Sequence, residues 1–402
     1  MNENIKYKNF VLPTFLKNLN KKNYNNSFSK ILIDIEKNLD NKNTLNVLSK
    51  NFILNFNNKD LNRFKKFKKI AIIGMGGSIL GSEAIYEFLE KKIKKKVFFL
   101  DNINEKKIHS LNNQNKSKIL FIVISKSGNT IETISNLLYL KVLKRNSKNI
   151  IIISEKNNNY LFNLSMKYKL FFIEHKNYVG GRYSVFSEVG LVPALLMGLN
   201  INKLRKNLQK FFEGKSMKYL KNSTVTLTKI LSKNRYTNII FLNYSPELEK
   251  FLFWCQQLIA ESLGKKNRGF LPIVSTAPKD HHSLLQLYLD GPKDKIFYLF
   301  SVEKDTKLNL IKTKYTNGIN FIKNKSLITI KDAQIKAVMM SFKENKIPFR
   351  EFRINKLDEE TLGELFTYFM LETVILGKLS KVNPFNQPAV EQVKVFTKKL
   401  LS

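Results

Sequence analysis

Short apolar runs alternate with amphipathic stretches over most of this chain. The apolar runs predict a first series of strands at 69–74, 96–100, 118–125 and 149–154, with helices between them, as at 79–91. A second series of strands is expected at 238–243, 270–275, 295–302 and 349–354, with helices at 246–266, 280–289, 331–345 and 358–376. Alternating strands and helices are typical of parallel sheets covered on both faces, so we predict an α/β fold.

The same pattern predicts how the chain is divided. We expect two doubly wound, mainly parallel units at residues 56–200 and 235–380. Short helices are expected in residues 1–55, a helical connection in 201–234, and one last helix within 381–402. Ligands of such sheets bind at the carboxyl ends of the strands. Several unusual loops of this chain fall at such ends.

The first such loop is Ser125-Lys126-Ser127-Gly128-Asn129-Thr130, which joins an apolar strand to a helix. The first turn of a helix leaves backbone N–H groups unpaired and carries partial positive charge. Hydroxyl side chains beside those groups form a compact cradle for phosphate. The alternative is a plain capping turn, because Ser, Thr and Asn are the usual N-caps.

Two glycine-rich segments also follow apolar runs. Gly74-Met75-Gly76-Gly77-Ser78 opens a helix, and its glycines allow a ligand close to the backbone. A dinucleotide site is an alternative, with Asp101 as the acidic partner, but the glycine spacing differs from that fingerprint. In Gly180-Gly181-Arg182, the paired glycines leave room for a reacting anion beside the arginine, although a surface salt bridge is the more frequent use of arginine.

The second half of the chain offers acid–base groups. Glu261 lies near the end of a mostly apolar helix and could act as a base, or be a solvated surface residue. His281 and His282 lie where the helix expected at 280–289 begins, and histidine shuttles protons near neutral pH; capping and metal binding are the alternatives. Gln387 and Lys394 are seven residues apart, which predicts one face of the last helix, with Glu391 beside Lys394. An ordinary amphipathic helix is the alternative.

Composition narrows the function classes. The 402 residues include 43% hydrophobic residues but no long apolar run typical of a membrane span, and the first residues lack an apolar signal core. The single cysteine, Cys255, excludes an intramolecular disulfide and a cysteine-rich metal site, so a cytoplasmic location is expected. The net charge of +37 comes from lysines scattered along the chain without a nucleic-acid-binding motif. Nucleic-acid binding is therefore a weak hypothesis, and attraction of anionic substrates a better one.

Six of these segments together resemble the glucose-6-phosphate isomerase family. They occur in that family's order: GMGGSILGSEA at 74–84, SKSGNTIET at 125–133, VGGRYSVFSEVGL at 179–191, ESLGK at 261–265, STAPKDHHSLLQ at 275–286 and NQPAVEQVK at 386–394. The resemblance implies two sugar-isomerase domains and reversible conversion of glucose 6-phosphate to fructose 6-phosphate. It implies a homodimer whose active site takes its histidine from the neighbouring subunit, and it requires neither a metal nor a redox cofactor.

The resemblance also implies roles for particular residues. Glu261 matches the base that moves a proton between sugar carbons 1 and 2, and Arg182 matches the residue that stabilises the enediolate. His282 matches the histidine that helps open the ring, assisted by Lys394. The matches expected to bind substrate are Gly77, Ser78, Ser125, Lys126, Ser127, Thr130 and Gln387. A sugar-phosphate sensor without catalysis, and an isomerase that also accepts mannose 6-phosphate, are the alternatives.

Overall fold

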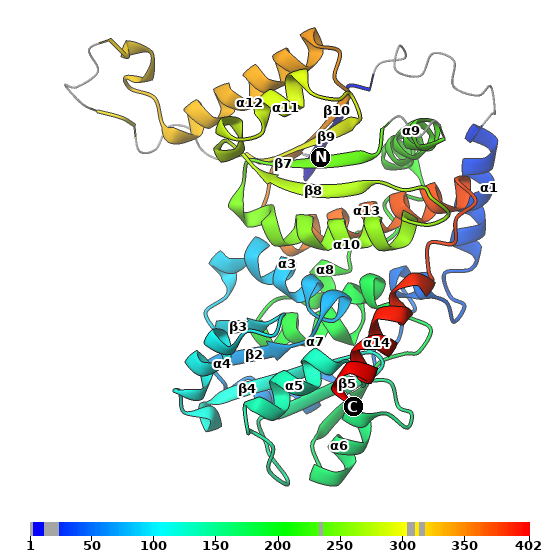
Figure 1. Ribbon diagram of the computed structural model, residues 1–402, viewed down its shortest axis with the longest axis vertical. Coiled ribbons are helices and arrows are strands. Elements are labelled where there is room, and N and C mark those ends of the chain that lie inside the picture. Colours follow the sequence, from blue (N-terminus) through cyan, green and yellow to red (C-terminus); the bar gives the residue numbers. More distant parts are fainter. Residues whose placement is uncertain (1–2, 12–23, 233–235, 304–309, 313–317) are drawn as a thin grey trace.

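The computed structural model of this protein contains two five-stranded sheets with helices packed against both (Figure 1). The structure describes residues 3–11, 24–232, 236–303, 310–312 and 318–402. One sheet has the strand order β3-β2-β4-β5-β6, and the other has the order β1-β10-β9-β7-β8. The predicted α/β fold with two mainly parallel sheets is therefore confirmed.

The first sheet is parallel throughout. In sheet order its strands are Lys96–Leu100, Lys69–Ile73, Ile119–Ile124, Ile150–Ser154 and Phe171–Glu174. Every residue of β4 and β5 is buried, which explains their unbroken apolar sequences, because helices cover both faces. Since β3 and β4 lie on opposite sides of β2, the strand order reverses there, and a crevice suited to a ligand forms at the carboxyl ends of β2 and β4.

The second sheet is mixed. In sheet order its strands are Ile5–Asn9, Phe349–Ile354, Lys295–Val302, Asn238–Asn243 and Leu271–Thr276. β1 pairs antiparallel with β10, with Ile5 opposite Ile354, whereas the other pairs are parallel. The expectation of short helices in residues 1–55 is therefore wrong for β1, because a strand of five residues is stabilised by a partner at the far end of the chain. Residues 1–2 and 12–23 of that segment lie outside the described residues.

Other elements match the predicted ones with shifted bounds. The helices that follow the strands of the first sheet are Leu80–Phe88 (α3), Glu105–Asn112 (α4), Ile131–Tyr139 (α5) and Tyr160–Tyr168 (α6). α1 spans Tyr24–Lys37, and the expected connection contains α8 at Ile201–Leu204 and α9 at Gly214–Leu231, with residues 233–235 outside the described ones. The helix expected at 280–289 is divided into a 3-10 turn, Lys279–His282, and α11, Leu285–Asp290. β6 is a strand that the apolar pattern did not predict.

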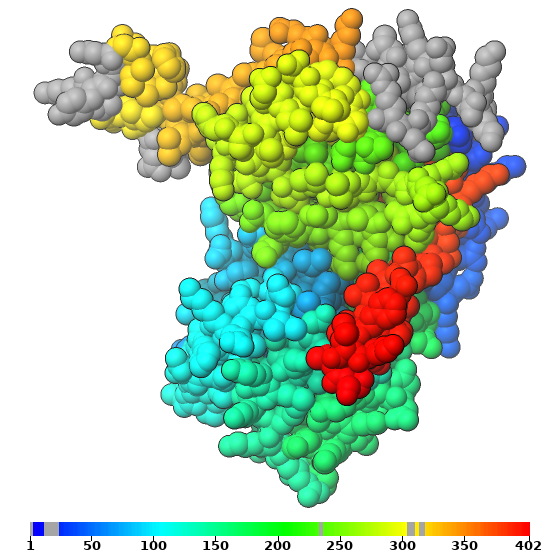
Figure 2. Space-filling model, viewed as in Figure 1, coloured from blue at the N-terminus to red at the C-terminus, as the bar shows by residue number. Residues whose placement is uncertain are grey.

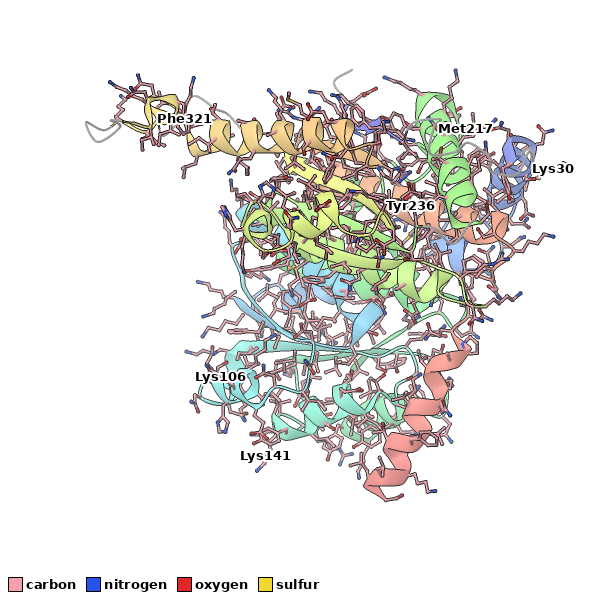
Figure 3. The ribbon with its side chains drawn as sticks, turned by 45° about the horizontal axis from the view of Figure 1, so that its top comes forward. Lys30, Lys106, Lys141, Met217, Tyr236 and Phe321 are labelled. Atoms are coloured by element: carbon pink, nitrogen blue, oxygen red, sulfur yellow. The ribbon has the colours of Figure 1, made fainter. Side chains whose placement is uncertain are left out.

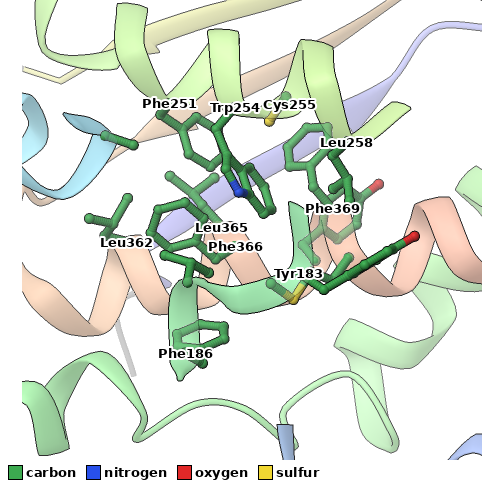
Figure 4. Close-up of a cluster of buried hydrophobic side chains, with 14 of the residues drawn as sticks. Tyr183, Phe186, Phe251, Trp254, Cys255, Leu258, Leu362, Leu365, Phe366 and Phe369 are labelled. Atoms are coloured by element: carbon green, nitrogen blue, oxygen red, sulfur yellow. The ribbon is translucent and has the colours of Figure 1, made fainter. Parts of the chain in front are cut away.

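Three mostly buried helices lie between the sheets: α7 (Glu188–Met197), α10 (Glu249–Leu263) and α13 (Glu359–Leu379) (Figure 1). α10 packs against α13 on one side and α3 on the other. Figure 4 shows the core that they form, with Trp254 of α10 against Phe366 of α13 at 4.7 Å between ring centroids. Since both sides of α10 are packed, its carboxyl end is held in a fixed place between the two sheets.

The surface carries the lysines and one projecting arm. Lys106 of α4 and Lys141, which follows α5, point into solvent, and the arm carries Phe321, which is 76% exposed (Figure 3). The arm leads into α12, Leu327–Glu344. The last helix, α14 (Glu391–Leu401), lies on the outside of the molecule, and none of its residues is buried (Figure 2). Among the described residues, no helix is long and apolar enough to cross a membrane.

Candidate active site

The crevice at the carboxyl ends of β2 and β4 contains the loop expected to bind phosphate. Ser125 and Thr130 face each other across it, with 2.8 Å between their hydroxyl oxygens. Thr130 stands at the N-cap of α5, but its side chain makes no capping hydrogen bond. The plain capping alternative is therefore not what the structure shows for Thr130. The first-turn N–H groups of α5 remain available to an anion.

The loop is held rigidly by the segment that opens α6. Gly128 has φ +65°, and a Cβ atom there would lie 1.7 Å from Oδ1 of Asn159. The Gly128 carbonyl accepts from Leu161 N at 3.1 Å, and Asn129 Oδ1 accepts from Tyr160 N at 2.9 Å. Only glycine fits this turn, so its place in the sequence has a local physical reason.

Lys126 extends from the same loop. Its Nζ atom lies 3.8 Å from Oε1 of Glu155, which follows β5. Burial lowers the pKa of Lys126, and the attraction of Glu155 opposes that shift. The loop therefore combines a cation with hydroxyls and free N–H groups, which is a suitable set for a phosphate dianion.

The Gly76–Ser78 turn touches the segment that carries Arg182. A Cβ atom on Gly77 would lie 2.3 Å from the carbonyl carbon of Gly181 and 2.6 Å from Arg182 N. The two backbones are thus in direct contact, which requires glycine at position 77. This contact joins the loop after β2 to the 3-10 helix Gly181–Phe186.

Arg182 is the central cation of the site and is only 4% exposed. Its Nε donates to Ser262 Oγ at 2.8 Å, its Nη1 to Gln387 Oε1 at 2.6 Å, and its Nη2 to the Pro384 carbonyl at 2.6 Å. Nη1 also lies 3.4 Å from Oε1 of Glu261. The predicted groups Arg182, Glu261 and Gln387 are therefore in one place, although they come from three distant parts of the chain.

Glu261 faces a large cavity. The cavity has a volume of about 1230 Å³, and its walls include Gln257, Glu261, Lys265 and Gln387. Leu271, the first residue of β8, also lines it. A carboxylate at the wall of a cavity, with a buried guanidinium 3.4 Å behind it, could remove a proton and help to stabilise the resulting oxyanion.

The structure does not bring His282 to this cavity. His282 follows the carboxyl end of β8, whereas the Glu261 cavity is at the amino end of the same strand, near Leu271. Six residues of strand separate the two ends, which is roughly 20 Å. His281 is bound locally, with Nε2 2.9 Å from the Tyr244 hydroxyl, and burial lowers the pKa of His281.

Lys394 is not among the residues that line the Glu261 cavity. Its Nζ pairs with Glu391 at 2.7 Å, as the spacing predicted, and both side chains are exposed. The expected common helix face of Gln387 and Lys394 is wrong. Gln387 precedes the 3-10 turn Pro388–Val390 with φ −157°, so it stands before the helix rather than on it. The proline at 388 opens the turn and disfavours a helical conformation for Gln387.

Several residues that bind Arg182 or line the cavity were not among the predicted site residues. Ser262 accepts from Arg182, and its hydroxyl lies 2.9 Å from that of Tyr183. Figure 4 shows Tyr183 at the edge of the buried cluster, with its hydroxyl pointing away from it. Gln257 and Lys265 line the cavity beside Glu261. The signal that could have found Gln257 is helical spacing, since it precedes Glu261 by one turn.

A dinucleotide site at Asp101 and a metal site, two of the alternatives considered from the sequence, lose support. Asp101, the acidic partner that a dinucleotide site would need, accepts a hydrogen bond from Lys107 Nζ at 2.7 Å. Over the part of the chain that the structure describes, no group of three His, Cys, Asp or Glu side chains could hold a metal ion. The single cysteine, Cys255, is buried in the core.

Comparisons with known proteins match this chain repeatedly to glucose-6-phosphate isomerases. A family model described as phosphoglucose isomerase matches residues 21–402. The glucose-6-phosphate isomerase of Methanocaldococcus jannaschii is 31% identical over 361 residues, covering 84% of this chain and 86% of that protein. The glucose-6-phosphate isomerase of Campylobacter jejuni is 32% identical over 353 residues, covering 83% and 86%.

Solved structures share the architecture. A crystal structure of a glucose-6-phosphate isomerase from Chlamydia trachomatis has a TM-score of 0.70 at 16% identity, covering 99% of this chain and 88% of that chain. A hypothetical protein from Thermus thermophilus has a TM-score of 0.82 at 24% identity, covering 99% and 100%. At these identities the structural matches bear on the fold alone.

Proposed function

The chain belongs to the phosphoglucose isomerase family and is an aldose–ketose isomerase of glucose 6-phosphate, and we propose that Glu261 is its catalytic base. One observation carries this proposal: the Glu261 carboxylate lies 3.4 Å from the buried Arg182 guanidinium at the wall of a cavity. The reaction moves one proton between neighbouring carbons of the open-chain sugar. A single carboxylate can take the proton from carbon 2 and return it to carbon 1.

Arg182 would stabilise the intermediate. Removing a proton next to a carbonyl leaves an enediolate, whose negative charge must be stabilised for the step to be fast. A positioned base contributes roughly 10²–10⁴-fold, and a positioned cation at the oxyanion contributes a comparable factor. Because Arg182 is 4% exposed, its charge acts with little screening by water.

The phosphate of the substrate would bind at the loop before α5. Ser125, Ser127 and Thr130 supply hydroxyl groups, Lys126 a cation, and α5 the partial positive charge of its first turn. Gly77 and Ser78 would border the sugar between this loop and Arg182. Fixing the phosphate restricts the sugar to one orientation, so that its first two carbons meet Glu261.

Ring opening would require His282 and Lys394, and we propose that a second copy of the chain supplies the histidine. Within one chain, the six residues of β8, roughly 20 Å, separate His282 from the Glu261 cavity. The cavity, at about 1230 Å³, exceeds the usual size of a small-molecule pocket, so a partner surface has room beside the substrate. α14 beside it exposes Val393 (67%) and Phe396 (54%), apolar side chains that a partner would cover.

A complementation experiment tests the shared site. Glu261→Gln and His282→Ala would each be inactive alone. In a mixed dimer one site carries both changes and the other carries neither, so mixing and refolding should restore about a quarter of wild-type activity. Mixtures that stay as inactive as their components would contradict a site built from two subunits.

The base is tested by Glu261→Gln in a coupled assay of fructose 6-phosphate conversion. We expect the turnover number to fall by roughly 10²–10⁴-fold with sugar-phosphate binding retained, because only the proton acceptor is lost. Glu36→Gln makes the same chemical change on an exposed site of α1 and should leave turnover unchanged. Near-normal turnover of Glu261→Gln would rule out this base.

The coupled assay also tests two alternative functions, a non-catalytic sensor and an isomerase of broader specificity. A non-catalytic sensor would bind the sugar phosphate but has no need of the Glu261 and Arg182 pair. An isomerase of broader specificity would also convert mannose 6-phosphate, which the same assay tests with that substrate.

A further inference from the structure

Lys265 follows the helix that carries Glu261 and has a fixed backbone. Lys265 and Arg268 exchange two backbone hydrogen bonds of 3.0 Å, which close a tight turn. The turn residues Lys266 and Asn267 have φ +54° and +55°, the geometry of a two-residue hairpin. The Cα of Lys265 is therefore held in place just beyond the end of α10.

The side chain of Lys265 reaches back and joins two distant segments. Its Nζ donates to the Ser262 carbonyl at 3.0 Å and to the Asn383 carbonyl at 2.6 Å. The first acceptor belongs to the last turn of α10, and the second opens the segment 383–387 that ends in Gln387. One ammonium group thus connects the helix of Glu261 to the segment of Gln387.

Arg182 holds the same segment a few residues further on. It donates to the Pro384 carbonyl at 2.6 Å, the Asn386 carbonyl at 3.3 Å and the Gln387 side chain at 2.6 Å. The segment is therefore anchored by two cations, and the Tyr183 hydroxyl also donates to the Pro384 carbonyl at 3.0 Å. Among the described residues, Lys265 is the only side chain that donates to the Asn383 carbonyl. Without Lys265, the segment would be held by Tyr183 and by Arg182, which also faces Glu261.

We propose that Lys265 is a positioning residue of the isomerase: its ammonium fixes segment 383–387, and so keeps Gln387 and Arg182 in register with Glu261. The proposal rests on the function proposed above. Lys265 need not touch the substrate, since it acts through the segment and the guanidinium. Misplacement by about 1 Å at such a site can cost 10²-fold in rate.

The charge of Lys265 makes this role sensitive to pH. Burial and the neighbouring Arg182 cation lower the pKa of Lys265 to about 8, and the Glu261 carboxylate opposes the shift. Segment 383–387, which Lys265 binds, has no titratable side chain. Tyr183, which also binds this segment, has its pKa raised by burial. Deprotonation replaces charge-assisted bonds with weaker neutral ones, so the segment is held less firmly above pH 8.

The test compares three variants of the full-length protein in the coupled assay between pH 6.5 and 9.5. Lys265→Met should lower kcat by roughly 10- to 100-fold, with less effect on KM, because it removes two bonds to a charged donor. Lys265→Arg keeps the charge at every pH tested, so it should retain most activity and lose the wild-type decline above pH 8. Lys266→Met, a change at the exposed neighbouring lysine, should match the wild type.

A second measurement is independent of turnover. Backbone amide exchange of residues 385–387 should be at least tenfold faster in Lys265→Met than in wild type, and unchanged in Lys266→Met. Wild-type kcat, pH profile or exchange in Lys265→Met would overturn the proposal. A wild-type protein without isomerase activity would overturn the proposed function instead, and amide exchange would still decide whether Lys265 holds the segment.

Discussion

Gly77→Ala is the substitution whose effect the geometry defines most sharply. The added Cβ would lie 2.3 Å from the carbonyl carbon of Gly181, 2.5 Å from its oxygen and 2.6 Å from Arg182 N. Carbon atoms prefer separations of about 3.5–4.0 Å, so the two backbones must move apart by roughly 1 Å. Because the neighbouring atoms are backbone, no side-chain rotation can relieve the clash.

Moving the two backbones apart would displace Arg182, whose Nη1 atom now lies 3.4 Å from Oε1 of Glu261. A shift of about 1 Å at a catalytic group can cost about 10²-fold in rate, and overpacking costs about 1–3 kcal/mol of stability. We therefore expect kcat to fall about 100-fold in the coupled assay, while urea unfolding shows a folded protein of lower stability.

Gly180→Ala is the matched control. Its added Cβ would meet only side chains, the nearest being a ring carbon of Tyr183 at 3.3 Å, and its φ of −68° suits alanine. The control should therefore keep kcat within a few-fold of wild type. Equal activity of the two variants would refute the argument that the Gly77 contact positions Arg182.

The phosphate loop, a buried ion pair and a buried carboxylate give the remaining predictions. Ser125→Ala combined with Thr130→Ala should raise KM for the sugar phosphate more than it lowers kcat, because both hydroxyls line the loop; an unchanged KM in steady-state kinetics would contradict the phosphate site. Glu372→Ala leaves the buried Arg350 unpaired and should lower the free energy of unfolding by about 3–5 kcal/mol, whereas the exposed Glu303→Gln should cost less than about 1 kcal/mol in the same urea titration. Burial raises the pKa of Glu83 from 4.5 to about 7, so the folded state binds the proton more tightly and stability falls as pH rises through that window. Glu83→Gln should reduce this fall between pH 5 and pH 8 in thermal melts, and an identical fall in both proteins would show that Glu83 does not cause it.

The local parts of the site were predictable from the sequence. The loop from Ser125 to Thr130 joins a buried strand to a helix, and its function depends on neighbours within a few residues. The glycines at 77 and 128 stand out in the sequence, but the residues that they contact closely, Gly181 and Asn159, are distant in the chain, so only the structure gives the reason for glycine there. The assignment of Glu261 and Arg182 depended on the family resemblance, because a single Glu or Arg on a helix or loop has many ordinary uses.

Contacts across the chain were not predictable in the same way. β1 forms because the edge of β10, more than 300 residues later, offers unpaired backbone groups. Gln387 lies before α14 rather than on it, because Pro388 begins a separate turn and Arg182 binds the Gln387 side chain. No periodicity in the sequence indicates that the Lys265 ammonium spans from Ser262 to Asn383.

The sequence by itself therefore determined the α/β class, most strands and helices, and the polar turn between β4 and α5 that we propose as the phosphate site, because short-range patterns decide each of these. Only the tertiary structure decided which side chains face one another: Glu261 lies beside Arg182, and Arg182 binds Gln387. Lys265 joins Ser262 to Asn383, and His282 lies beyond the opposite end of β8 from the Glu261 cavity. The physical reason is that the packing of α10 against α3, α13 and β8 fixes the distances between these side chains. Such packing depends on residues that are far apart in the chain.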